Sequence, residues 1–527
     1  MKIEKVRLCT ENAWHEMSLE NDSYTFRDVS LSVNSLGEVK ITSDTTAVAK
    51  FEVEFENKYF QNALILGDAW ERAYANLEWK MPNINRVMPW YFLADDKEKV
   101  YCFGVKTQPN AMCSWQCDET KILLYIDVKN GTLDLSLNGR VLDACTIVNS
   151  IYSEDAIIAA KKFCKLMCDN PRLPNRIIYG GNDWYCNYGD NSFDKILTHA
   201  RRIVECMPDN APKPYMVIDD GWEMVNHPEP PFYFTGGPWK YGNYRFGDMK
   251  KMAEAIEKEG AIPGIWYRPL QTVESLPEDA VRVQNGMIAT IDISTETGLD
   301  VVRQDITRFR EWGYKLIKHD YSSDDIFGRY HMTNEELYGK EVEFADKTRT
   351  TAEIVKSFYR TIREAAGDDV LIIGCNTMSH LSAGIFDIQR TGDDTSGKNW
   401  RKTVDFGVNT LAFRMAQHNT FYCVDADCIG ITNEIDWDKN KLWLDVLSKS
   451  GTPLFVSIGD DAYTDEVKKD LKKAFERVVN TPITSYALDW QETKTPQKWV
   501  SFYGEDEYEW NQNEICDDEA IVARQIN

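Results

Sequence analysis

Four short apolar runs in this 527-residue chain lead into acidic residues. An apolar strand that runs into carboxylates is unfavourable for burial, and a purely structural protein has no need to repeat the pattern. Carboxylates from different strands suit glycoside hydrolysis, in which one attacks the sugar and another protonates the leaving oxygen. The four runs are Val217-Ile218-Asp219-Asp220, Leu316-Ile317-Lys318-His319-Asp320, Gln389-Arg390-Thr391-Gly392-Asp393-Asp394 and Tyr422-Cys423-Val424-Asp425-Ala426-Asp427.

Two other interpretations of these carboxylates remain open. Clustered Asp side chains also bind Mg²⁺ or Ca²⁺, although no His-rich or thiolate ligand set accompanies them here. Any single Asp can instead cap a helix or stabilise a loop. Because the pattern recurs after four strands, we favour catalysis, and we expect no metal and no cofactor.

The elements that must position the carboxylates alternate short apolar runs with amphipathic helical stretches from residue 175 to residue 480. This pattern predicts successive βα units with parallel strands. Eight strands make a closed (β/α)8 barrel, whose C-terminal face gathers polar residues that follow the strands. We expect strands at Ile177–Tyr179, Tyr215–Ile218, Ile262–Tyr267, Lys315–Lys318, Val370–Ile373, Ile385–Gln389, Thr420–Val424 and Thr452–Val456.

The flanking regions read as β-structure. Residues 1–170 show short alternating runs between turn signals such as Asn130-Gly131 and Asn138-Gly139, which predicts a β-sandwich domain. Residues 481–527 return to alternation and predict a small C-terminal β-element. The expected fold class is therefore α/β: a (β/α)8 TIM barrel with an N-terminal β-sandwich domain and a small C-terminal β-element.

Residues 175–480 resemble glycoside hydrolase clan D, which contains the family 27 and family 36 α-galactosidases, and most closely family 36. The sequence Asp219-Asp220-Gly221-Trp222 matches a family motif whose carboxylates bind the 4- and 6-hydroxyls of the sugar. Lys318-His319-Asp320 corresponds to the family's Lys-x-Asp. The resemblance implies that Asp320 is the nucleophile and that Lys318 contacts ring hydroxyls.

The acid/base follows from the same resemblance. Arg390-Thr391-Gly392-Asp393-Asp394 is similar to the family stretch that carries it, and we choose Asp393 because it follows Thr-Gly. Asp394 stays an alternative, since Arg390 stands four residues before it, the spacing seen in family 27. The resemblance also places Cys375 near the 2-hydroxyl and Arg390 near the 2- or 3-hydroxyl. The competing interpretations are a small buried thiol and a surface ion pair.

Three tryptophans, Trp184, Trp222 and Trp266, are candidates for platforms under the apolar face of a sugar ring, against the alternative of packing at the barrel mouth. One departure stands out. Family 36 has a Trp-Phe-Glu-Pro-Glu segment where this chain has Trp266-Tyr267-Arg268-Pro269-Leu270. A positive Arg268 could change the polarity of the subsite or recognise an acidic or sulfated substrate.

These features predict a retaining α-glycosidase, in the first place an α-galactosidase acting on an oligosaccharide or glycoside. The two carboxyl groups would then lie about 5 to 5.5 Å apart, against roughly 6.5 to 9.5 Å in an inverting enzyme. An α-N-acetylgalactosaminidase, another α-glycosidase or a transglycosylase would share the scaffold. A non-catalytic carbohydrate-binding protein and a metal-dependent barrel enzyme remain alternatives.

Composition limits the partners and the location. A formal net charge of −24 argues against nucleic acid and anionic membranes, because neutralising phosphates needs clustered Lys and Arg. The N-terminus shows no apolar signal region, and no stretch approaches a membrane span. Thirteen scattered cysteines fit reduced thiols, so we expect a cytoplasmic protein, and a homo-oligomer is compatible with the sequence.

Overall fold

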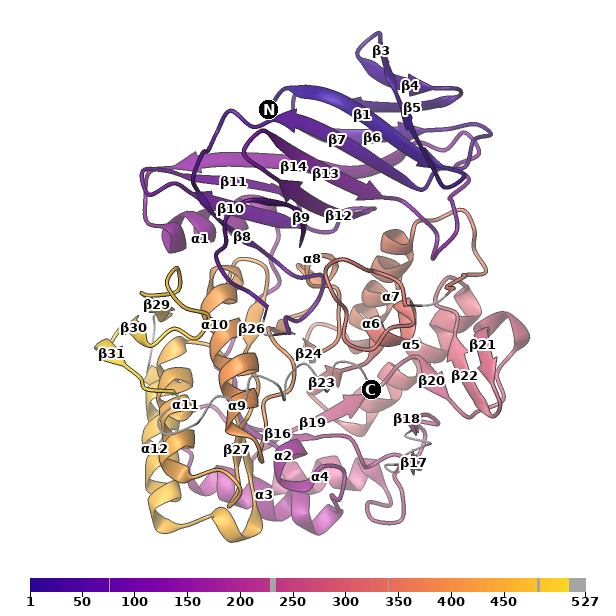
Figure 1. Ribbon diagram of the computed structural model, residues 1–527. Coiled ribbons are helices and arrows are strands. Elements are labelled where there is room, and N and C mark those ends of the chain that lie inside the picture. Colours follow the sequence, from indigo (N-terminus) through magenta and orange to yellow (C-terminus); the bar gives the residue numbers. More distant parts are fainter. Residues whose placement is uncertain (75, 228–233, 340, 481–483, 511–527) are drawn as a thin grey trace.

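The computed structural model describes residues 1–74, 76–227, 234–339, 341–480 and 484–510. A β-sandwich formed by the N-terminal part sits on a barrel formed by the middle of the chain, and a small C-terminal sheet lies beside the barrel (Figure 1). This arrangement confirms the expected fold class.

The sandwich consists of two antiparallel sheets, with strand orders β2-β1-β7-β13-β12-β9 and β3-β4-β5-β6-β14-β11-β10-β8. Alternation places apolar side chains in its core: in β6, Val39 and Ile41 are buried while Glu38 and Lys40 face solvent. Helix α1 (Ala156–Met167) packs on β11 and β14. The strands are β1 Ile3–Thr10, β2 Ala13–Glu16, β3 Ser18–Glu20, β4 Ser23–Phe26, β5 Val29–Val33, β6 Glu38–Thr42, β7 Lys50–Glu56, β8 Leu64–Gly67, β9 Asn83–Pro89, β10 Tyr91–Asp95, β11 Val100–Val105, β12 Met112–Cys117, β13 Lys121–Asp127 and β14 Leu142–Tyr152.

The barrel is a parallel sheet in the order β26-β25-β24-β23-β19-β16-β15-β28-β27. Its two end strands, β26 and β27, are separated in sequence only by residues 426–428. Together they occupy the seventh strand position of the barrel: β26 pairs with β25, and β27 pairs with β28. Asp427, whose φ is 77°, interrupts the extended backbone between β26 and β27. The strands are β15 Tyr179–Asn182, β16 Tyr215–Ile218, β19 Ile262–Tyr267, β23 Leu316–His319, β24 Leu371–Gly374, β25 Ile388–Arg390, β26 Cys423–Asp425, β27 Ile429–Ile431 and β28 Leu454–Ile458.

All eight expected strands coincide with or overlap observed ones, and two, β16 and β19, have the predicted bounds. The sixth begins three residues later than Ile385, because the N–H groups of Ile385 and Phe386 still bond to the Ser382 carbonyl at the end of a helical turn. The break at Asp427 was not predicted.

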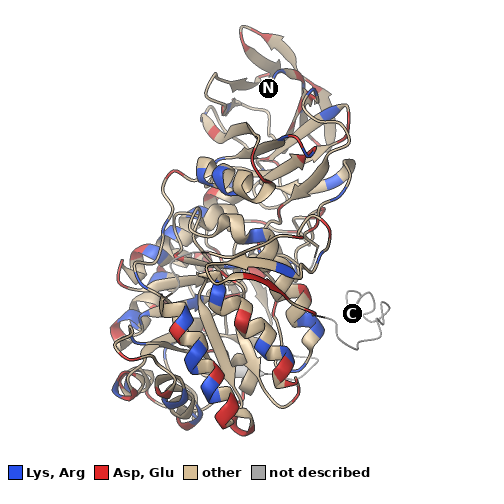
Figure 2. Ribbon diagram, turned by 90° about the vertical axis from the view of Figure 1, so that its left-hand side faces the viewer, with Lys and Arg blue, Asp and Glu red and all other residues tan. Residues whose placement is uncertain are grey.

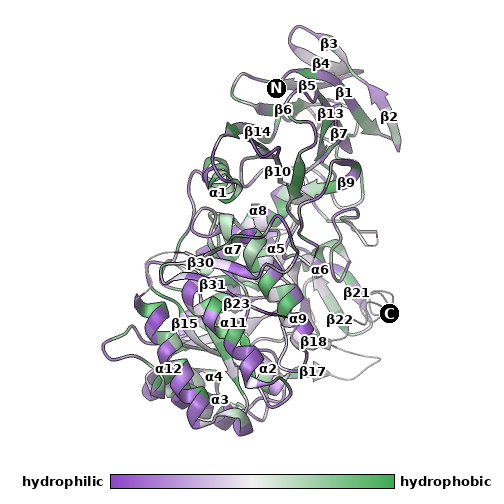
Figure 3. Ribbon diagram, turned by 60° about the vertical axis from the view of Figure 1, so that its left-hand side comes forward, coloured by the Kyte–Doolittle hydropathy of each residue, from purple (hydrophilic) through white to green (hydrophobic). Residues whose placement is uncertain are grey.

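Helices surround the barrel, and several of them begin at a residue whose side chain caps the first turn. In α4 (Met249–Glu259) the Asp248 side chain accepts from the Lys250 N–H at 2.9 Å, and Gly260 ends the helix with a φ of 100°. Hydrophilic and hydrophobic residues alternate along α3 and α12 (Figure 3). The remaining helices are α2 Trp184–Asn187, α3 Phe193–Glu205, α5 Glu296–Trp312, α6 Ser322–Phe327, α7 Thr351–Ala366, α8 Ser379–Ser382, α9 Trp400–Lys402, α10 Asn409–Arg414, α11 Trp437–Ser450 and α12 Asp465–Asn480. There are also three short 3-10 helices, η1 Glu278–Ala280, η3 Met415–Gln417 and η4 Asp460–Ala462, and a π-helix, η2 Thr403–Val408.

Smaller sheets complete the structure. They are β17 Val225–His227 with β18 Phe234–Gly236; β20 Gln271–Thr272 with β21 Val281–Asn285 and β22 Ile288–Ile291; and the C-terminal sheet of β29 Tyr486–Ala487, β30 Lys498–Ser501 and β31 Gly504–Glu507. In the view of Figure 2, Lys and Arg are interspersed with Asp and Glu along the outer helices. Of the helices in the described ranges, none combines the length and apolar composition that crossing a membrane needs.

The sandwich docks on the C-terminal face of the barrel through the segment of residues 68–74, which follows β8. Asp68 is buried and accepts from Arg414 of α10 at 2.8 and 2.9 Å. Ala73 forms a parallel β-bridge with Gly392, directly beside the predicted acid/base. The sandwich therefore reaches into the region where the strand-end carboxylates lie.

Candidate active site

The C-terminal ends of the barrel strands bring the predicted residues together. Asp219, after β16, accepts from Asn182 Nδ2 of β15 at 2.6 Å and from Lys318 Nζ of β23 at 2.7 Å. Its backbone N–H donates to Asp183 Oδ1 at 2.7 Å. Burial and the neighbouring Asp219 raise the pKa of Asp183 to about 6. The strands β15, β16 and β23 thus contribute to one buried polar network.

Asp320 lies at the end of β23 with three hydrogen-bond donors around its carboxylate. Trp266 Nε1 donates to Oδ2 at 2.9 Å, and the Tyr321 N–H donates to Oδ1 at 2.8 Å. The Asn376 amide, in the orientation that satisfies both its ends, also donates to Oδ1. Donors to both oxygens fix the orientation of the carboxylate, which an attacking carboxylate requires.

Asp393 is held by a residue of the sandwich. Arg72 Nη2 lies 2.8 Å from Asp393 Oδ1, and Arg72 Nη1 lies 3.2 Å from Asp394 Oδ1. On its other oxygen, Asp393 lies 3.5 Å from His331 Nδ1. Burial raises the pKa of Asp394, but the charges of Arg72 and Arg390 outweigh burial and lower this pKa to about 2. Asp394 is therefore held as a carboxylate.

One chain of side chains joins the two predicted catalytic groups. Asn376 donates to Asp320, its oxygen accepts from Arg72 Nε at 3.1 Å, and Arg72 pairs with Asp393. Asp320, Asp393 and Asn376 belong to three barrel strand ends, and Arg72 belongs to the sandwich. Both domains are therefore needed to set the relative position of the two carboxyl groups.

Asp220 faces a different environment from its neighbour Asp219. Thr235 Oγ1 lies 2.8 Å from Asp220 Oδ1 and 3.1 Å from Glu223 Oε1. Burial, and next the Glu223 carboxyl, raise the pKa of Asp220 well above its usual value. The raised pKa of Asp220 favours its protonated form, and a protonated carboxyl can donate a hydrogen bond as well as accept one.

Arg390 and Cys375 lie beside the predicted acid/base, Asp393. Arg390 is 1% exposed, pairs with Asp427 at 2.9 Å and donates to the Asp393 carbonyl at 3.2 Å. It lies 3.5 Å from the Cys375 sulfur, and burial raises the pKa of that thiol. Arg390 is thus a buried residue that holds the turn carrying Asp393, and a surface ion pair is ruled out.

Two of the three predicted platforms do not offer a ring face. Trp222 is fully buried and donates through Nε1 to the Trp266 carbonyl at 3.0 Å. Trp266 is 1% exposed and meets Asp320 through its N–H. Other aromatic rings, such as that of Trp239, pack against Trp222 and Trp266, so the ring faces of both tryptophans lie in the core. Trp184 is half-buried, at the start of α2, and remains a candidate platform.

Arg268 does not present a free charge for an acidic substrate. Its Nε and Nη2 donate to the two oxygens of Asp325 at 3.0 and 2.7 Å. Its Nη1 donates to the Thr235 carbonyl at 3.2 Å, and the guanidinium lies 4.2 Å from the Tyr321 ring centre. A bidentate buried partner already neutralises the arginine, so it supports Tyr321 instead.

Sequence reasoning missed Arg72, His331 and Asp427 as parts of the site. Asp427 stands in one of the strand-end acidic runs, so that signal was present. Arg72 lies in another domain, 321 positions before Asp393, and His331 lies in the long connection between α6 and α7. No local pattern marks either residue.

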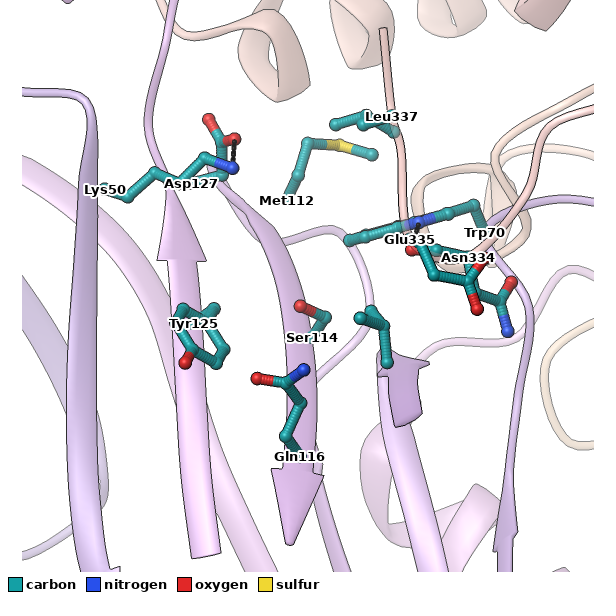
Figure 4. A pocket seen from close by; sticks show the side chains of 11 residues that line it. Lys50, Trp70, Met112, Ser114, Gln116, Tyr125, Asp127, Asn334, Glu335 and Leu337 are labelled. Carbon is teal, nitrogen blue, oxygen red and sulfur yellow. Dashed lines mark hydrogen bonds and ion pairs between the residues drawn. The ribbon is translucent and has the colours of Figure 1, made fainter. Parts of the chain in front are cut away.

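A separate cavity of about 160 Å³ lies between the sandwich and residues 334–337 (Figure 4). Its lining includes Trp70, Asn334 and the ion pair between Lys50 and Asp127, whose charged atoms are 3.2 Å apart. Trp70 Nε1 donates to the Asn334 carbonyl at 3.0 Å. None of the predicted catalytic residues lines it. Over the described ranges, no group of three or more His, Cys, Asp and Glu side chains is arranged to hold a metal ion.

Comparison with known proteins identifies the fold. No family model matches the chain. An α-galactosidase from Thermus thermophilus in complex with p-nitrophenyl α-D-galactopyranoside superposes with a TM-score of 0.61 at 16% identity, covering 96% of this chain and 99% of that one. A family 36 α-galactosidase variant from Geobacillus stearothermophilus in complex with raffinose gives 0.61 at 13% identity, covering 95% and 79%. The α-galactosidase from Lactobacillus brevis gives 0.59 at 12% identity, covering 91% and 69%.

These similarities extend over the sandwich and the barrel together, and the solved structures come from three bacterial genera. At such low identity they establish architecture, and the chemistry has to be argued from the side chains. This chain has the fold of the glycoside hydrolase family 36 α-galactosidases.

Proposed function

We propose that this protein is a retaining α-glycosidase that hydrolyses terminal α-galactosyl residues of oligosaccharides or glycosides. The observation that carries the proposal is the connection from Asp320 through Asn376 and Arg72 to Asp393 at the mouth of the barrel. This connection fixes the positions of two carboxyl groups with different partners: Asp320 accepts hydrogen bonds from Trp266 and Tyr321, and Asp393 pairs with Arg72. Solved structures with the same fold are α-galactosidases with galactosides bound, which supports the choice of sugar.

The first step would use Asp320 as nucleophile. Its oxygen attacks the anomeric carbon while the bond from that carbon to the leaving oxygen breaks, and the leaving oxygen takes the proton of Asp393. The products are a galactosyl ester of Asp320 and the free alcohol or sugar. Donors from Trp266 and Tyr321 keep the attacking carboxylate oriented.

The second step would reverse the roles. Asp393, now ionised beside Arg72, takes a proton from water as the water oxygen attacks the anomeric carbon. The ester bond to Asp320 breaks, which restores both carboxyl groups and releases galactose. Two inversions give net retention of configuration.

Recognition of the sugar would fall to the network around Asp219. Lys318 donates to Asp219 at 2.7 Å, and Asp220 carries its own Thr235 and Glu223 partners. A buried acceptor that loses its hydroxyl partner is costly, so such a pair discriminates between sugars that differ in one hydroxyl. All cysteines in the described ranges are free thiols, which supports the proposed reducing, cytoplasmic location.

The test is turnover of aryl α-galactoside, α-N-acetylgalactosaminide and α-glucoside by the wild type and by Asp320→Ala. We expect cleavage of the galactoside that is lost in Asp320→Ala. Asp461→Ala is the matched control, because Asp461 is exposed and also follows a barrel strand. Loss in both variants, or persistence in Asp320→Ala, would contradict the assigned nucleophile.

Two further measurements address the mechanism. Proton NMR of the first-formed sugar should show the α-anomer, and a β-anomer would overturn retention. Asp393→Asn should lose most activity on substrates with poor leaving groups and keep more on an activated fluoride, because only the former need the proton. No turnover of any substrate by the wild type would leave the fold standing and reject the proposed enzyme.

A further inference from the structure

The outer face of one sandwich sheet forms one wall of the cavity shown in Figure 4. In β12, Cys113 and Trp115 are fully buried in the core of the sandwich, so the alternate side chains Met112, Ser114 and Gln116 point to the opposite face. All three of these line the cavity. The pleat of this strand therefore directs a thioether, a hydroxyl and an amide into the same space.

The neighbouring strand and the connection between α6 and α7 supply the other walls. Tyr125 of β13 stands opposite Ser114 in the strand register and also lines the cavity. Trp70, Asn334 and Glu335 lie on the side opposite these two strands (Figure 4). The cavity is therefore built by the sandwich together with a connection of the barrel, and it combines rings with polar groups.

The size of the cavity suits one six-membered ring. Its volume is about 160 Å³. An apolar cavity of about 150 Å³ in another protein binds benzene, so a space of this size accepts a single ring. Because hydroxyl, amide and carboxylate groups line the space here, the ring that fits it carries hydrogen-bonding substituents.

Three polar side chains of the cavity make no hydrogen bond to any residue in the described ranges. They are Ser114 and Gln116 on the sheet and Glu335 on the opposite side. Ser114 is only 8% exposed, and polar groups buried to this extent usually have a partner. Groups able to donate and to accept hydrogen bonds are thus available on both sides of the space.

The charges of the lining restrict the class of ligand. Lys50 and Asp127 pair with each other at 3.2 Å, whereas Glu335 makes no ion pair within the part of the chain that the structure describes. An unpaired carboxylate repels phosphate and other anions, and it accepts hydrogen bonds from hydroxyls. Met112 and Leu337 add apolar surface that suits the C–H face of a sugar ring. A neutral polyhydroxylated ring meets all of these conditions.

We propose that this cavity binds one neutral sugar ring, as a second binding site separate from the barrel mouth. Ser114 and Gln116 bind hydroxyls from the side of the sheet, and Glu335 accepts from hydroxyls on the opposite side. None of the predicted catalytic residues lines the cavity, so its occupancy does not depend on the proposed glycosidase activity.

The test is isothermal titration calorimetry of full-length Asp219→Asn with galactose, glucose and mannose. This background removes the charge at the centre of the barrel-mouth network and keeps the shape of the side chain, so the remaining heat reports the cavity. At least one of the three sugars should bind. Adding Gln116→Leu should weaken that binding about two- to tenfold, and adding Glu335→Ala about tenfold or more, because a hydrogen bond to a charged group contributes more.

Glu336→Ala is the matched control. Glu336 is the next residue, is also exposed and pairs with Arg329, but it does not line the cavity. Its binding should equal that of the background. Melting temperatures show that each variant is folded, and a crystal of the wild type soaked in the same sugar shows directly whether the cavity is filled.

Three results would overturn the second site. They are no binding of any of the three sugars, binding that survives Gln116→Leu together with Glu335→Ala, and binding of inorganic phosphate in place of a sugar. Turnover of aryl α-galactoside by the wild type is measured separately and decides the proposed function, so either can fail without the other.

Discussion

Replacing Arg72 by Met tests whether the sandwich completes the active site. Arg72 donates to Asp393 at 2.8 Å and to Asp394 at 3.2 Å. Hydrogen bonds to charged groups contribute about 1.5–3 kcal/mol each, so the two together amount to about 3–6 kcal/mol. If the transition state needs both, kcat/KM should fall by about 10²- to 10⁴-fold, since each ~1.4 kcal/mol is a factor of ten.

The assay is kcat/KM on aryl α-galactosides whose leaving groups differ in basicity. The loss in Arg72→Met should be largest for the most basic leaving group, because Arg72 acts through the residue that protonates it. The titration of Asp394 gives a second signature. Arg72 is the largest influence that lowers the pKa of Asp394, so in Arg72→Met an NMR titration should show that pKa raised above about 2.

Arg140→Met provides the matched control. Arg140 also belongs to the sandwich and also makes an arginine–carboxylate pair across the domain interface, donating to both oxygens of Glu353 at 2.8 and 3.0 Å. It should lower stability without this loss of activity. The reasoning would be refuted if Arg72→Met retained activity within about threefold of wild type, or if Arg140→Met lost as much.

Three further predictions concern single contacts. Trp266→Phe should lower kcat about ten- to a hundredfold because it removes the N–H donor to Asp320, whereas Trp222→Phe, equally buried, should change only the melting temperature. Arg268→Met should lower the free energy of unfolding, measured by urea denaturation, by about 3–5 kcal/mol, because it leaves the buried charge of Asp325 unpaired. Adding Asp325→Asn to this variant removes that charge and should recover part of the lost stability. Burial raises the pKa of Asp425 from 3.8 to about 6, so its ionisation opposes folding as the pH rises through this range. The gain in unfolding free energy from Asp425→Asn should be close to zero well below pH 3.8 and should grow to about 3 kcal/mol above pH 6. A gain that falls as the pH rises would contradict this sign.

The sequence was sufficient for the fold class and for most of the strand-end residues. Strand and helix periodicity are local properties, and parallel strands in a barrel must present their C-terminal ends on one face. The residues after those strands, such as Asp219, Asp320 and Asp393, can therefore be grouped from the sequence alone. Their position directly after an apolar run predicts that they lie on the same face of the barrel.

The tertiary structure decided which partner each of these groups meets. Arg72 reaches Asp393 only because the sandwich docks on the barrel mouth, and Arg268 is neutralised only because α6 places Asp325 against it. Trp222, predicted as a platform, turned out to be core. Burial, charge pairing and the packing of one domain on another depend on contacts between residues hundreds of positions apart, and no local pattern of residues encodes them.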